Sequence, residues 1–106
     1  CGIYGDIAHG YINLVRNGSN ILVADSAGSR TPATKVFNFS QQDGTMHTHA
    51  SQYLDSPATA SAVTYKLQLK SSNTSQVHIN RSGRDNDGSG YDGRATSSIT
   101  VLEIAG

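Results

Sequence analysis

The chain has 106 residues, the size of one small domain, so a multi-domain organisation is excluded. Eight basic and eight acidic side chains give a formal net charge of zero, and only 15% of the residues are charged. Because nucleic acids and anionic membranes are bound through basic patches, we expect no nucleic-acid partner and no membrane insertion.

The apolar content is low for a globular domain. Leu, Ile, Val and Phe together supply 21 of the 106 residues, near the lower limit for a folded chain. Disordered chains combine such a composition with a high net charge, and this chain has no net charge. We therefore expect a β-rich domain with a thin core that completes its burial against copies of itself.

The single cysteine and the N-terminus exclude further classes. The only cysteine is Cys1, so neither an intrachain disulfide nor a zinc site with two or four cysteines of one chain can form. Because the first residue is not Met, we expect a processed product or an excised part of a longer protein. Gly2, Gly5 and Gly10 interrupt the N-terminal segment, and no apolar run approaches the roughly 18 residues of a spanning helix.

The N-terminal segment has no clear pattern. We expect residues 1–17 to be a connector or the end of an upstream stalk, and residues 18–106 to form the domain. A turn signal at residues 17–20 is followed by the apolar run Ile21–Ala24, which predicts a short strand.

Two further strands are predicted before residue 51. Lys35–Ser40 alternates between polar and apolar residues, with Phe37 and Phe39 facing inward. A turn at residues 42–44 precedes an expected strand over Thr45–Ala50.

The clearest alternation lies in the second half of the chain. In Ala62–Lys70 the odd positions are apolar from residue 63 onward and the even positions from residue 64 onward are polar, which predicts a strand with one buried face. Gln76–Asn80 continues the alternation after the polar connection Ser71–Ser75. These two strands are predicted to form an antiparallel pair.

The C-terminal run, residues 97–104, carries apolar groups on both faces. Ile99 and Val101 point one way and Leu102 and Ile104 the other, so a strand here needs cover on both sides. In so small a domain the second cover is expected to be a neighbouring subunit, and these four residues are the predicted subunit interface.

Taken together, the segments predict an all-β protein. No segment has a sustained helical period, and Gly and Asn punctuate the chain every ten or so residues. Short strands with such spacing are typical of an antiparallel β-sandwich or jelly roll.

Several motifs carry a resemblance to a known family. They are Arg16-Asn17-Gly18, Asp25 to Thr31, Tyr53 to Thr59, Thr64-Tyr65-Lys66, Ile79 to Ser82 and Ser97 to Ile104. Together they resemble the C-terminal domain of structural proteins of tailed bacteriophages, especially tail-fibre and virion-appendage proteins of cyanobacterial and other marine phages. The similarity covers residues 16–104 and is most specific from Leu54 onward.

The resemblance implies architecture and location. Domains of that kind generally form trimeric β-sandwiches similar to the complement and tumour-necrosis-factor jelly rolls, lie outside the virion and have no enzymatic role. It therefore implies a homotrimer at the extracellular virion surface that contacts other virion proteins and a host-surface glycan or an outer-membrane receptor. A capsid decoration or head-fibre protein and a monomeric carbohydrate-binding module are the alternatives.

His47-Thr48-His49 is the first candidate metal site. Side chains at i and i+2 of a strand share a face, so both imidazoles would project together. Around a threefold axis they would supply six nitrogens for an iron-group divalent ion, and the resemblance supports this, because phage fibre tips hold metal through His-x-His. The alternative is a solvated strand face with two ordinary histidines.

The second candidate metal site is a calcium loop that starts at Asp85. Asp85, Asp87 and Ser89 occupy positions 1, 3 and 5 of a calcium-loop pattern, and Gly90 occupies position 6. The pattern lacks the bidentate Glu, because position 12 is Thr96. A solvated Gly/Asp/Asn hairpin loop explains the same residues. Apart from these two metal hypotheses we expect no cofactor.

Residues 82–95 are the predicted receptor-contact loop. The segment is long and rich in Gly and polar groups, and its candidate contact residues are Arg84, Asn86, Tyr91 and Asp92. The arginines that flank its acidic residues are expected to pair with those carboxylates at the surface.

No catalytic motif accompanies the many Ser, His and Asp residues. A Gly-x-Ser-x-Gly elbow is absent, and sequence spacing pairs no carboxylates for glycosidase chemistry. We therefore expect a protein that is not an enzyme.

Overall fold

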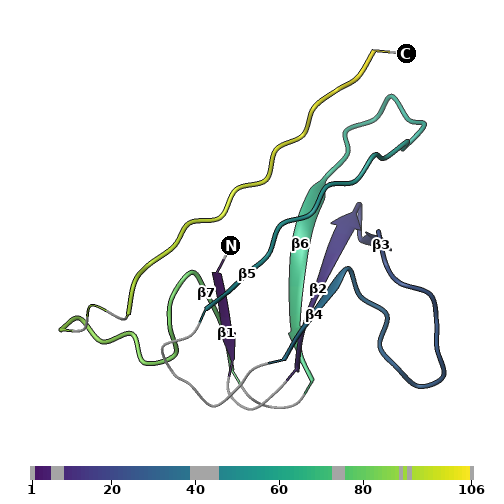
Figure 1. Cartoon of the computed structure of the whole chain (residues 1–106). Coiled ribbons are helices and arrows are strands. Elements are labelled where there is room, and N and C mark those ends of the chain that lie inside the picture. Colours follow the sequence, from purple (N-terminus) through teal and green to yellow (C-terminus); the bar gives the residue numbers. More distant parts are fainter. Residues whose placement is uncertain are drawn as a thin grey trace.

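The computed structural model describes residues 2–5, 9–38, 46–72, 76–88, 90 and 92–105. Within these residues the chain forms strands and no helix (Figure 1), so none of the described segments is a helix that could cross a membrane. The strands are β1 (Gly2–Gly5), β2 (His9–Arg16), β3 (Ser19–Ile21), β4 (Lys35–Asn38), β5 (His47–Thr48), β6 (Tyr65–Ser71) and β7 (Val77–Ile79). Every strand pair is antiparallel, which confirms the predicted all-β, antiparallel class.

The strands form two sheets. In the larger sheet β2 is central: β6 pairs with it from residue 10 to residue 16, and β3 and β4 pair with successive parts of its other side. The smaller sheet has the order β5-β1-β7.

The β2–β3 hairpin turns at Asn17 and Gly18. Both residues have positive φ, 47° and 86°, as a two-residue type I′ turn requires. Arg16 pairs with Ser19 across the turn. The predicted turn is confirmed, whereas the boundary predicted at 17/18 falls inside a hairpin. The described residues among 1–17 include β1 and the central strand β2.

The predicted strand pair in the second half is wrong. The strand expected over 62–70 forms as β6 and the one over 76–80 as β7, but β6 pairs with β2 and β7 pairs with β1. The polar connection therefore links two sheets instead of closing a hairpin. The partner strands come from the N-terminal segment, in which His9 and Asn13 interrupt the apolar alternation.

The strand predicted over 21–24 is wrong, because β3 ends at Ile21 and Leu22 has a positive φ of 52°. Strand β4 lies in the run predicted over 35–40 and β5 in the run predicted over 45–50, and residues 39–45 of these runs lie outside the described residues. Phe37 is buried, as predicted. Phe39 lies outside the described residues.

The core is small. Ile12 and Phe37 are its buried centre, and Leu67, Leu69 and Val77 pack against them. Because Val77 belongs to β7, the smaller sheet contributes to the core formed by the larger one. The alternation predicted for β6 is confirmed: its apolar odd positions are half-buried and its polar even positions are exposed.

The chain exposes far more surface than a compact domain of its mass. Its accessible surface is 7566 Å², whereas a monomeric protein of 11.2 kDa exposes about 5,700 Å². The excess is about 1,900 Å². The radius of gyration, 16.0 Å, likewise exceeds the roughly 13 Å of a compact domain of this length.

The C-terminal segment is the main departure from the prediction. Residues 97–104 belong to no strand of the described chain, and Figure 1 shows them (yellow) as an extended arm apart from both sheets. The strand predicted there does not form within one copy, because no described strand of the same chain pairs with it.

Candidate functional site

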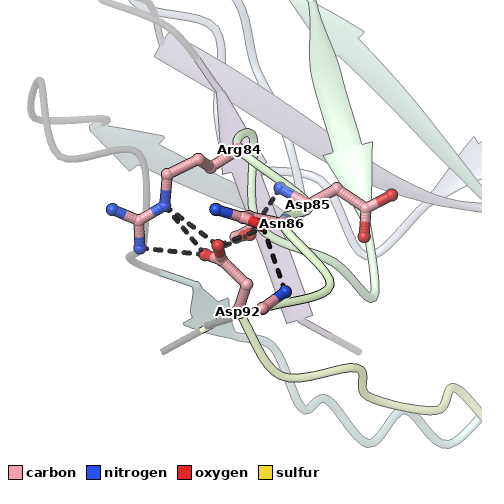
Figure 2. A network of polar contacts seen from close by, with 6 residues as sticks. Arg84, Asp85, Asn86 and Asp92 are labelled. Atoms are coloured by element: carbon pink, nitrogen blue, oxygen red, sulfur yellow. Dashed lines mark hydrogen bonds and ion pairs between the residues drawn. The ribbon is translucent and has the colours of Figure 1, made fainter. Parts of the chain in front are cut away.

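The loop at residues 82–95 is organised around one buried carboxylate (Figure 2). The Asp92 side chain is fully buried and accepts hydrogen bonds from Arg84 Nε at 2.9 Å and Nη2 at 3.0 Å. The Ser82 hydroxyl donates a hydrogen bond to the same carboxylate at 2.8 Å, and the backbone amide of Asn86 donates another at 3.2 Å. These bonds, chiefly those from Arg84, lower the pKa of Asp92 to about 2. The carboxylate is therefore ionised at neutral pH and holds three parts of the loop together.

A second carboxylate in the loop links two more arginines. Asp85 forms ion pairs with Arg81 at 3.1 Å and with Arg94 at 2.9 Å. Its amide donates to the Ser82 hydroxyl at 3.1 Å, and Ser82 also bonds Asp92. The predicted pairing of arginines with the acidic residues is confirmed. The two networks share Ser82, which is fully buried, so they tie the described residues of the loop together.

The loop presents a shallow polar depression of about 140 Å³ to solvent. Its lining residues are Asp85, Asn86, Asp87, Asp92 and Arg94.

The predicted contact residues have different roles in this loop. Asn86 is exposed and Arg84 is partly exposed. The Asp92 carboxylate is buried and holds the loop together, and Asp92 also lines the depression, so its role in receptor contact stays a prediction. Tyr91 lies outside the described residues.

The calcium site stays a prediction. Asp85 already has two guanidinium partners, and Asp87 is exposed. Ser89 lies outside the described residues. In the part of the chain that is described, no three His, Cys, Asp or Glu side chains gather as a metal site.

His47 and His49 do share a face, as their spacing predicts. Their rings lie 6.1 Å and 6.2 Å from the ring of Phe37. His49 is buried and contacts Ser51 Oγ at 3.2 Å. Burial is the main cause of its lowered pKa, and the charge of Lys35 adds to the effect. The shared face is thus directed at the core, and the axial metal site stays a prediction.

Sequence reasoning missed a polar contact between distant segments. Asp55 forms an ion pair with Arg16 Nη1 and accepts a 2.7 Å hydrogen bond from the Tyr65 hydroxyl. Arg16 and Tyr65 are paired residues of β2 and β6. Next to them, the Thr64 amide donates to the Asn17 side chain at 2.8 Å. These contacts fasten the segment between β5 and β6 to the larger sheet.

The only hint of this contact in the sequence was indirect. Arg16, Asp55 and Tyr65 all belong to motifs that carry the phage resemblance. No local pattern predicts that these residues meet, because Arg16 lies 39 positions from Asp55 and Tyr65 lies 10 positions from it.

The apolar residues of the C-terminal arm are exposed. Ile99 is 56% exposed, Val101 65%, Leu102 82% and Ile104 75%. At the start of the arm the Ala95 amide donates to the Asn80 carbonyl at 2.9 Å, and the Ser97 hydroxyl bonds the Asn80 side chain. Four large apolar side chains in sequence on an extended segment form a surface that is suited to a partner.

Comparison with protein-family models, curated proteins and solved structures gives no match to this chain. Its function is therefore inferred from its own residues.

Proposed function

We propose that this chain is a structural module of a phage virion appendage: a homotrimeric jelly-roll domain of a tail fibre that joins three chains and contacts a host-surface receptor. The C-terminal arm is the subunit interface, through Ile99, Val101, Leu102 and Ile104. The domain lies at the virion surface, and its role is not enzymatic.

The main support for the proposal is the accessible surface of one chain, which exceeds that of a compact monomer of the same mass. An excess of about 1,900 Å² per chain is close to what a ring subunit buries, since each of its two interfaces takes about 800 Å² or more of its surface. The four exposed apolar side chains of the arm are part of this excess surface. A single copy with four buried apolar residues among those described has little else to stabilise it.

The contact loop supports the receptor part of the proposal. A binding loop that is already ordered loses less conformational entropy when it binds its partner. Asp92 and Asp85 supply that order through Arg84, Arg81 and Arg94. The polar depression beside them suits a hydroxyl-rich ligand such as a glycan.

The solution mass tests the assembly. Light scattering coupled to size exclusion is expected to give three times the 11.2 kDa of one chain. A cooperatively melting monomer would overturn the proposal and leave the carbohydrate-binding module as the better reading. Electron microscopy of virions that carry the labelled domain separates a tail fibre from a capsid decoration protein.

A further inference from the structure

Residues 65–70 of strand β6 present a long outer edge that no strand in the described part of the chain covers. One side of the strand pairs with β2, and no other described strand pairs with its outer side. An unpaired edge is a row of amide and carbonyl groups that accepts an added strand.

The C-terminal arm, residues 97–104, also has backbone groups that could pair with another strand. Beyond Ala95, its described residues make no backbone-to-backbone hydrogen bond. Residues 97–104 are about as long as β6 when extended, and Figure 1 shows the arm as a nearly straight trace. An extended segment with unpaired backbone groups on both sides is suited to strand addition.

The side chains of the two segments are complementary. Leu67 and Leu69 of β6 face the core, and Lys66 and Lys70 face solvent. In the arm, Leu102 and Ile104 lie on one face, with Glu103 between them on the opposite face. Since alternate residues share a face, a strand that continues the leucine layer places its carboxylate on the lysine face.

Three charged side chains lie on these faces. Neither Lys66, Lys70 nor Glu103 takes part in an ion pair among the described residues. Glu103 is the only glutamate in the sequence. Opposite charges on one face of adjacent strands favour one register over its neighbours.

We infer that the arm of one copy adds as a strand to the outer edge of β6 in the next copy, with Leu102 and Ile104 extending the Leu67–Leu69 layer and Glu103 opposite Gln68, between Lys66 and Lys70. This inference rests on the proposed function. Because the arm and the β6 edge are different surfaces, the contact is heterologous. In a closed ring of copies, every arm pairs with the β6 edge of the next copy.

Disulfide trapping tests the contact. In a chain with Cys1→Ser, the pair Gln68→Cys and Glu103→Cys is expected to give cross-linked species of two and three chains on non-reducing gels. The matched control pairs Glu103→Cys with Val36→Cys, an exposed residue of β4 at the opposite side of the same sheet. The control is expected to give little cross-linking.

The outcomes separate this inference from the proposed function. If the Cys1→Ser parent is trimeric but the 68/103 pair cross-links no better than the 36/103 pair, the docking edge is wrong and the trimer stands. Disulfides formed only within one chain also overturn the docking. A monomeric parent overturns both.

Charge reversal provides a second test that does not depend on cysteine chemistry. Glu103→Lys is expected to raise the concentration at which the trimer half-dissociates by about tenfold, because it sets like charges on one face. Adding Lys66→Glu and Lys70→Glu to the same chain is expected to restore it. Equal dissociation of all three proteins would contradict the proposed register.

Discussion

Truncating the two most exposed apolar side chains of the arm is the sharpest test of the assembly. Leu102→Ala and Ile104→Ala each remove three carbon groups, worth about 0.8 kcal/mol apiece when buried. These side chains are 82% and 75% exposed in one copy, so each still has about 2 kcal/mol to contribute on association. The double variant is therefore expected to lose about 4 kcal/mol at each interface, or roughly a thousandfold in its association constant.

Sedimentation velocity over a dilution series measures this loss. The double variant is expected to change from trimer to monomer at far higher concentration than the parent chain. Val23→Ala is the matched control, because Val23 is 41% exposed but lies outside the arm. The reasoning is refuted if the double variant and the control dissociate alike, since the arm would then bury nothing on assembly.

Three further outcomes are expected. Asp92→Asn should make the loop more sensitive to proteolysis, with Asp87→Asn as the exposed control. Because the folded pKa of Asp92 is depressed to about 2, its contribution to stability is complete above its unfolded value near 4 and is lost as the pH falls toward 2, which a carbon-13 NMR titration of the carboxyl group can follow. Tyr65→Phe removes the hydroxyl that donates to Asp55, so hydrogen exchange over residues 50–60 should become faster. Phe37→Ala should cost about 3–5 kcal/mol in urea unfolding, because it empties the centre of a small core.

Local patterns were enough to predict several elements. The alternation in β6 and the turn at Asn17-Gly18 depend on neighbouring residues only, since period-two patterning and positive φ are local properties. The same holds for the pairing of arginines and aspartates in the 82–95 loop, whose partners lie within ten positions of one another.

Long-range contacts were decided by the tertiary structure alone. Nothing near Gly10 or Asn13 marks β2 as the centre of a sheet, because strands pair through backbone groups, and these are the same at every residue. The same is true of Asp55, whose contact with Arg16 joins segments 39 residues apart. Which carboxylate of the loop is buried also depends on how the loop folds: the Asp92 side chain is fully buried, whereas that of Asp85 is 26% exposed.

The sequence by itself determined that the C-terminal run is apolar on both faces, and hence that it needs cover on both sides. Only the tertiary structure showed that one copy leaves Leu102 and Ile104 largely exposed. Hydrophobicity is a property of each residue, but burial depends on which strands the rest of the chain brings alongside it. In this chain every described strand pairs with another strand, and none of them pairs with the arm.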